Sequence, residues 1–173
     1  RMEPEIMGFS NARFYGGRLV AHASIAAREP VERGAFAAPV VFVDTAGCDF
    51  NEEQDPETLS YRTPGEARLL ERLFAETQTL RGSTGVIAAY RNQASLLREV
   101  LAESLASERP PQIDTVDSFQ GREQDWIFLS LVRSNDDGET GFLGEIRRMN
   151  VALTRDRRQM VVVCDSATLS YQP

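Results

Sequence analysis

The segment Trp126-Ile-Phe-Leu-Ser-Leu-Val132 is apolar at almost every position, too apolar for a strand at the exposed edge of a sheet. Short apolar runs of similar length occur before and after it, and each predicts a further strand. These runs are Val40–Asp44, Gly85–Ala89, Ile113–Val116 and Met160–Cys164. We therefore expect a sheet of five strands, with the 126–132 strand among its inner members.

Segments with helical spacing separate these strands. Thr63 stands at a predicted N-cap, Pro64 at the first helical position and Glu66 three residues after the cap, which is the pattern of a capping box. Helical spacing also predicts helices over 93–106 and 146–154. Strands separated by helices require crossover connections, so the sequence predicts an α/β fold with a mainly parallel sheet and helices on both faces.

Length and composition indicate one folded domain that covers residues 1–173. The chain has 173 residues, of which 42% are hydrophobic and 26% charged, so it can bury a core and is not expected to be disordered. Its apolar stretches are far shorter than the roughly 20 residues that cross a membrane. We expect no membrane association and a cytoplasmic location. Cys48 and Cys164 form no CxxC pair, so neither a zinc site nor a disulfide framework is expected.

Two parts of the chain are less regular. Residues 1–39 form an irregular entry segment in which Pro4-Glu5-Ile6 opens a helix. Residues 44–61 form an acidic loop, and between Asp44 and Glu57 it holds six carboxylates and no basic residue. We expect this loop to be solvated and mobile. It lacks the spacing of a calcium loop, so no metal site is predicted.

The basic residues exclude one class of nucleotide site. All 19 of them are arginines, and the net charge is −7. A phosphate-binding loop of the GxxxxGK[ST] kind needs a lysine, so this chain contains no intact P-loop. If nucleotide chemistry occurs here, another chain or domain has to supply part of the site. The only histidine, His22, makes a hydrolase triad improbable.

Polar runs follow three of the predicted strands, where ligands gather in parallel α/β sheets. They are Tyr90–Gln93, Asp117–Glu123 and Arg133–Asn135. The segment Arg147–Arg158 holds five arginines, and clustered guanidinium groups suit phosphate. Surface ion pairs and an ordinary basic helix face explain the same patterns, so spacing alone leaves both interpretations open.

Two of these segments resemble helicase motifs. Thr115-Val-Asp-Ser-Phe-Gln-Gly-Arg-Glu123, followed by Asn150-Val-Ala-Leu-Thr-Arg155, resembles the fifth and sixth motifs of superfamily 1 helicases, in the group that contains the nonsense-mediated-decay helicase. Arg1–Ile6 and Gly85–Gln93 resemble further parts of the same group. The resemblance covers nearly the whole chain and implies the second RecA-like domain of a two-domain motor. The first domain, with the P-loop and the Mg²⁺-binding Asp-Glu pair, is not in this sequence.

The resemblance also implies functional residues. ATP would lie between the two domains, with Mg²⁺ bound mainly by the first, and an arginine of the second domain would stabilise the γ-phosphate as an arginine finger. Single-stranded DNA or RNA and the first RecA-like domain are the implied partners. The implied site residues are Arg155 and Arg1 for catalysis, Glu123, Gly121, Arg122 and Gln120 for ATP, with Glu123 on the ribose, and Tyr90, Thr115 and Ser118 for nucleic acid.

The sequence thus predicts the second motor domain of an ATP-dependent DNA or RNA helicase, inactive as an isolated fragment. The alternative is a catalytically inert helicase-like module that binds nucleic acid or a protein partner. One departure from the helicase pattern is Asp156, which stands beside Arg155 where the group usually has a small residue. This acidic neighbour can neutralise part of the charge of Arg155.

Overall fold

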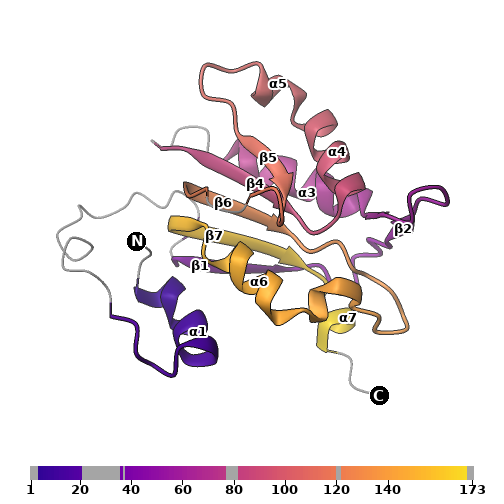
Figure 1. Cartoon of the computed structure of the whole chain (residues 1–173). Helices are drawn as coiled ribbons and strands as arrows, with labels where there is room; N and C mark the ends of the chain where they lie inside the picture. Colours follow the sequence, from indigo (N-terminus) through magenta and orange to yellow (C-terminus); the bar gives the residue numbers. More distant parts are fainter. Residues whose placement is uncertain (1–3, 21–35, 37, 77–81, 120–121, 171–173) are drawn as a thin grey trace.

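The computed structural model describes residues 4–20, 36, 38–76, 82–119 and 122–170 (Figure 1). Its main sheet has five strands in the order β1-β7-β6-β4-β5, and every neighbouring pair is parallel. The strands are β1 (Val40–Asp44), β4 (Thr84–Ala88), β5 (Gln112–Thr115), β6 (Gln124–Ser130) and β7 (Asp156–Cys164). The apolar strand β6 lies in the middle, as its composition predicts.

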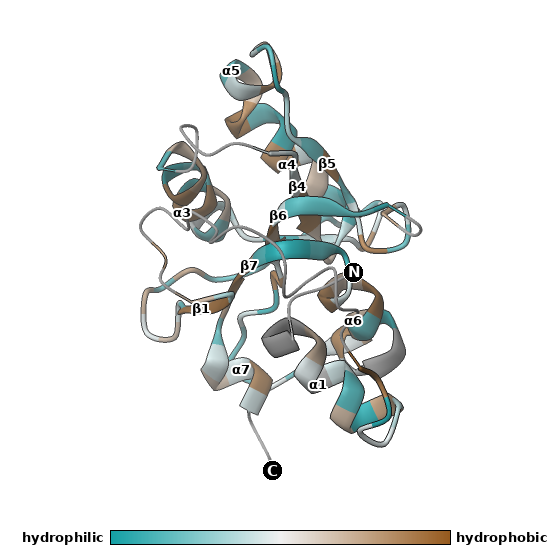
Figure 2. Ribbon diagram, turned by 90° about the vertical axis from the view of Figure 1, so that its left-hand side faces the viewer, coloured by the Kyte–Doolittle hydropathy of each residue, from teal (hydrophilic) through white to brown (hydrophobic). Residues whose placement is uncertain are grey.

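Helices cover both faces of the sheet, which confirms the predicted α/β fold and agrees with a RecA-like domain (Figure 2). One layer contains α3 (Pro64–Ala75), α4 (Arg91–Val100) and α5 (Ala102–Leu105). The other contains α1 (Pro4–Phe14), α6 (Ile146–Leu153) and α7 (Ser166–Ser170), and a short 3₁₀ helix, η1 (Gly141–Gly144), precedes α6. In the described part of the chain, no helix is long and apolar enough to cross a membrane.

Each face of the sheet has its own hydrophobic core. Ile127 and Leu129 point from β6 into the core beneath α6, whereas Phe128 points into the core beneath α3 and α4. The neighbouring strand β7 alternates in the same way, because Met160 and Val161 belong to opposite cores. Burial of both faces explains why the sequence of these strands is continuously apolar rather than alternating.

The connection from β5 to β6 crosses one face of the sheet. β5 is an edge strand and β4 lies between it and β6, and the described residues Val116 and Phe119 of the connection pack into the core beneath α6. Phe119 anchors this segment and is fully buried. It packs against Gly85, where an added Cβ would lie 2.6 Å from the Phe119 ring. The glycine therefore gives the crossing segment the room that it needs.

Several predicted boundaries are wrong. The 93–106 helix is divided at Leu101 into α4 and α5. Strand β7 begins at Asp156, four residues before the predicted start. The prediction omits these first four residues because they are polar and do not belong to the apolar run. The predicted capping box does not form: Thr63 is the N-cap, but its hydroxyl oxygen accepts no N–H of its own helix, and its O–H donates to the Val132 carbonyl at 2.6 Å.

The acidic loop contains secondary structure that the sequence does not predict. It contains a two-stranded antiparallel sheet formed by β2 (Glu53–Gln54) and β3 (Tyr61–Arg62). The Asp55 carboxylate closes the turn between them by accepting hydrogen bonds from the Thr58 backbone and hydroxyl at 2.7 and 2.9 Å. The Asp55 carboxylate therefore builds local structure within the acidic loop.

Candidate functional site

The predicted site residues lie at two opposite edges of the sheet. Tyr90 follows β4 and Thr115 ends β5, so both lie at the carboxyl edge. Glu123 and Arg155 directly precede β6 and β7, which places both at the amino edge. Only one of the two groups of candidate residues therefore lies where strands end. Arg1, Gln120 and Gly121 lie outside the described residues.

The amino edge brings Glu123 and Arg155 together through the backbone. The N–H of Gln124, next to Glu123, donates to the Arg155 carbonyl at 3.0 Å. The Arg155 side chain folds back on the end of α6, where Nε donates to the Val151 carbonyl at 2.8 Å. Its Nη2 donates to the Thr154 hydroxyl at 3.0 Å. These bonds occupy two of the five guanidinium N–H donors.

Glu123 is held in its charged form at this edge. Its Oε2 accepts a hydrogen bond from Arg157 Nε at 3.2 Å. Partial burial alone would raise the pKa of Glu123, but the hydrogen bond from Arg157 and the charges of Arg157 and Arg155 lower it below the ordinary value. An ionised carboxylate accepts hydrogen bonds from hydroxyl groups, as contact with a ribose requires.

Arg122, the remaining described member of the predicted ATP set, is oriented differently. Its exposed side chain forms a 3.6 Å ion pair with Asp114 on β5. Asp114 is also 3.3 Å from Arg98 of α4. The described contacts therefore place Arg122 against the edge strand rather than beside Glu123 or Arg155.

Asp156 does not neutralise Arg155 in this structure. It is only 1% exposed, and neither of its carboxylate oxygens has a hydrogen-bond partner in the described part of the chain. Burial raises the pKa of Asp156 to about 7. The expected ion pair is missing because the two side chains diverge: Asp156 points into the interior, and Arg155 bonds to the end of α6.

At the carboxyl edge, Thr115 and Ser118 form a pair of hydroxyl groups. The Thr115 hydroxyl donates to Ser118 Oγ at 3.1 Å. Ser118 is exposed and Thr115 is half-buried. Hydroxyl groups at this position can bond phosphate or sugar oxygens without reading a base sequence. The structure thus brings together two of the three residues predicted to contact nucleic acid.

Tyr90, the third, lies in an aromatic cluster with a buried arginine. Its ring makes edge contacts with Tyr61 at 5.2 Å and with Phe142 at 4.9 Å between centroids. Its hydroxyl is 3.5 Å from Arg133 Nη1, and the Arg133 guanidinium lies 4.3 Å from the centre of the Tyr61 ring. We call Tyr61, Tyr90, Arg133 and Phe142 the tyrosine–arginine cluster.

An ion pair fixes this cluster to the acidic loop. Arg133 is 3% exposed, and its Nε donates to Glu52 Oε2 at 2.8 Å. The same oxygen accepts the backbone N–H of Ser134 at 2.7 Å. The sequence indicates the position of Arg133 after a strand, but nothing in it links Arg133 to Glu52, which lies 81 residues away.

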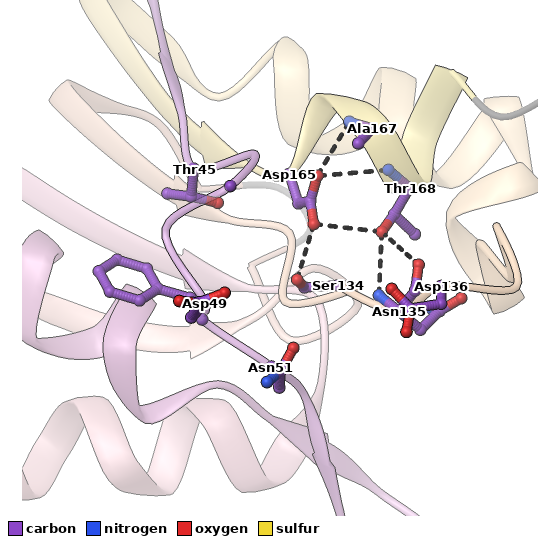
Figure 3. A pocket seen from close by; sticks show the side chains of 11 residues that line it. Thr45, Asp49, Asn51, Ser134, Asn135, Asp136, Asp165, Ala167 and Thr168 are labelled. Carbon is purple, nitrogen blue, oxygen red and sulfur yellow. Dashed lines mark hydrogen bonds between the residues drawn. The ribbon is translucent and has the colours of Figure 1, made fainter.

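A cavity of about 280 Å³ opens beside this cluster, at the carboxyl ends of β1, β6 and β7 (Figure 3). Asp165 organises it by accepting hydrogen bonds from the Ser134 hydroxyl at 2.7 Å and from the Ala167 backbone at 2.9 Å. Asp49 and Asp136 add two more carboxylates to the lining. Such a lining disfavours phosphate. No group of three or more His, Cys, Asp or Glu side chains within the described ranges could hold a metal ion.

Comparison with known proteins identifies the family. A family model described as "AAA domain" matches residues 1–167. The DNA-binding protein SMUBP-2 of Rattus norvegicus is 38% identical over 98% of this chain and 18% of its own length. The DNA polymerase alpha-associated DNA helicase A of Saccharomyces cerevisiae is 38% identical over 94% of this chain and 26% of its own length.

Two further relatives carry names that match the group suggested by the sequence motifs. The regulator of nonsense transcripts 1 of Dictyostelium discoideum is 33% identical over the whole chain and 14% of its own length. Helicase SEN1 of Saccharomyces cerevisiae is 34% identical over 98% of the chain and 8% of its own length. The chain spans about a quarter or less of each of these relatives. It belongs to the AAA domain family, and its relatives place it among the superfamily 1 helicases.

Proposed function

We propose that the chain is the second motor domain of an ATP-dependent helicase that acts on single-stranded DNA or RNA. ATP and Mg²⁺ are bound mainly by a first RecA-like domain that carries the P-loop, and this chain completes the site from its amino edge. The observation that carries the proposal is the division of the candidate residues between two edges of one sheet. One edge is available to a nucleotide and the other to nucleic acid, and the rigid strands between them connect the two.

Arg155 is the proposed arginine finger. A guanidinium stays charged and can bond two phosphate oxygens at once, so it suits the charge that develops on a transferred γ-phosphoryl group. In the structure, Arg155 bonds to Val151 and Thr154. The proposal requires it to exchange these bonds for bonds to the γ-phosphate when the first domain and ATP approach. Arg1 is proposed as a second phosphate contact on the resemblance alone.

Glu123 is the proposed ribose contact. Its carboxylate is ionised and accepts hydrogen bonds, and Arg157 fixes its orientation from 3.2 Å. Because Gln124 and Arg155 share a backbone hydrogen bond, Glu123 and the finger keep a constant spacing. The phosphate contact and the ribose contact then approach the nucleotide as one unit.

The carboxyl edge is the proposed nucleic-acid surface. The Thr115 and Ser118 hydroxyls supply phosphate or sugar contacts, and Tyr90 contributes an aromatic ring. Aromatic rings and backbone contacts bind single strands with little sequence preference. The chain is acidic overall, so we propose that the first domain supplies much of the positive charge that nucleic acid needs.

The experiment that tests this proposal separates the two edges in the full-length polypeptide. Glu123→Gln should raise the KM for ATP and leave the affinity for a labelled single strand unchanged. The double substitution Thr115→Val and Ser118→Ala should lower the affinity for the labelled single strand. It should leave the KM for ATP unchanged at saturating nucleic acid. Equal losses in both quantities from either change would contradict the two-edge arrangement. A wild-type protein that binds the strand without ATP turnover would instead be an inert binding module.

A further inference from the structure

Strand β6 ends in a strained turn. Val132 has φ of 75°, in the left-handed region that β-branched residues rarely adopt. The Arg133 N–H donates to the Leu131 carbonyl at 2.9 Å, so the three residues close a γ-turn of the rare, strained form. Strained backbone persists only where the surroundings hold it, and it concentrates at functional sites. Neighbouring groups must therefore hold Val132 in this strained conformation, and the strain suggests that the turn has a function.

The structural cause is the carboxylate of Glu66 on α3. Its Oε1 accepts the Leu131 N–H and its Oε2 accepts the Val132 N–H, each at 3.0 Å. Glu66 is 2% exposed, so these bonds form away from water. The Thr63 hydroxyl donates to the Val132 carbonyl at 2.6 Å from the same helix end. Residues at the start of α3 thus hold the turn through the N–H groups of Leu131 and Val132 and through the Val132 carbonyl.

Further buried polar groups surround the turn. Gln93 of α4 accepts the Thr63 N–H at 2.8 Å and donates to the Ser130 hydroxyl at 3.0 Å. Thr63, Gln93 and Ser130 are all buried. These bonds pair backbone groups that are buried away from water, and they connect the end of β6 to α3 and α4. The network thereby fixes the direction in which the chain leaves β6.

The direction of the chain after Val132 determines where Arg133 lies within the tyrosine–arginine cluster. The residue after the turn is Arg133, which reaches Glu52 at 2.8 Å and the Tyr90 hydroxyl at 3.5 Å. There is little free space here, because a Cβ at Gly141 would lie 2.4 Å from Arg133 Nη1 and 2.7 Å from the Tyr90 hydroxyl. A different path at Val132 would redirect Arg133 and leave Tyr90 without its partner.

We propose that Glu66 is a positioning residue for the nucleic-acid surface: its buried carboxylate holds the left-handed turn at Val132, and the turn directs Arg133 against Tyr90. This inference rests on the proposed function for its effect on nucleic acid. Its structural part, that Glu66 enforces the turn, stands independently. Glu66 touches neither nucleic acid nor nucleotide in this scheme and acts only through the backbone of residues 131–133.

Two substitutions test the proposal on this chain. Glu66→Gln keeps the size of the side chain but removes one acceptor, and Val132→Gly permits the left-handed conformation without strain. Amide hydrogen exchange measured by NMR reports the turn, because the Arg133 N–H is bonded within it. Fluorescence anisotropy with labelled oligo(dT) and oligo(U) reports the surface. Glu71→Gln, on the exposed side of the same helix, is the matched control.

Glu66→Gln should lower the protection of the Arg133 amide and weaken oligonucleotide binding, each by about tenfold, as loss of one buried hydrogen bond of about 1.4 kcal/mol implies. Adding Val132→Gly should restore both quantities, because glycine keeps the turn without the carboxylate. If Glu66→Gln alone does not fold, the double variant should fold. Glu71→Gln should change neither quantity.

The outcomes separate the two proposals. If Glu66→Gln leaves the Arg133 amide protected, or if Val132→Gly does not restore it, the positioning role is wrong. If both single and double variants are unfolded, Glu66 acts as a general core residue and the role is also wrong. If wild type binds neither oligonucleotide while the exchange results follow the prediction, the turn mechanism stands and the nucleic-acid function of this domain fails.

Discussion

Asp156→Ala should stabilise the protein above about pH 7. The wild-type carboxyl is 1% exposed and has no hydrogen-bond partner in the described part of the chain, and burial raises its pKa from 3.8 to about 7. The unfolded chain releases this proton near pH 4, whereas the folded chain keeps it until about pH 7. Between these values the folded state binds more protons, so raising the pH costs wild type stability, and the loss is complete above the folded pKa.

The magnitude follows from the two pKa values. Each pKa unit corresponds to about 1.4 kcal/mol, so between pH 5 and pH 8 the carboxyl costs wild type about 2 to 3 kcal/mol. The removed carboxyl leaves a small side chain at the start of β7, beside Gln124 of β6. Asp156→Ala should therefore have a flatter dependence of unfolding free energy on pH than wild type.

The assay is urea unfolding of wild type and variant at several pH values between 5 and 8. Glu66 also has a pKa raised by burial, to about 8, but it is present in both proteins and cancels in their difference. The control is Asp137→Ala, which removes an exposed carboxyl of the same type. A difference between wild type and Asp156→Ala that does not change with pH would refute the reasoning, as would an equal pH effect in the control.

Three further predictions concern stability and activity. Glu52→Gln should destabilise the fold by about 3 kcal/mol in urea unfolding, because it leaves the buried Arg133 guanidinium with only the longer 3.6 Å ion pair to exposed Glu139. Glu53→Gln in the same loop should cost about 0 to 1 kcal/mol because its ion pair with Arg62 is half-exposed. Gly85→Ala should lower the free energy of unfolding by about 1 to 3 kcal/mol, because the added Cβ overlaps the buried Phe119 ring. The control Gly8→Ala, whose added Cβ meets no atom within 4 Å, should be neutral or stabilising. Equal losses of stability in the two variants would contradict the packing argument. The isolated chain should show no Mg²⁺-dependent ATP hydrolysis, and measurable turnover in a phosphate-release assay would count against the two-domain site.

Much of the fold could be predicted because its signals are local. The apolar run at 126–132 and the helical spacing after Pro64 are consequences of burial on one or both sides. The start of β7 was missed because residues 156–159 are polar, and their burial depends on neighbours that local sequence does not show. The same limit applies to Asp156, whose burial only the folded sheet determines.

The site was predictable in part for the same reason. The motifs around Thr115 and Arg155 mark the two edges, but they do not show that the edges are opposite, because that follows from strand order and direction. Glu66 carries the local signature of a capping box, yet its carboxylate binds backbone 65 and 66 residues away. Long-range partners compete with local ones, and sequence spacing cannot tell which will win.

The most direct test of the account is the kcat for ATP of the full-length polypeptide that contains this domain, measured with saturating ATP and single-stranded nucleic acid. Arg155→Ala should lower kcat by about 10³-fold or more while strand binding is retained, as loss of an arginine finger predicts. Arg68→Ala, an exposed arginine on α3, should leave kcat unchanged. An unchanged kcat in Arg155→Ala would remove the finger from the mechanism and contradict the motor function of the amino edge.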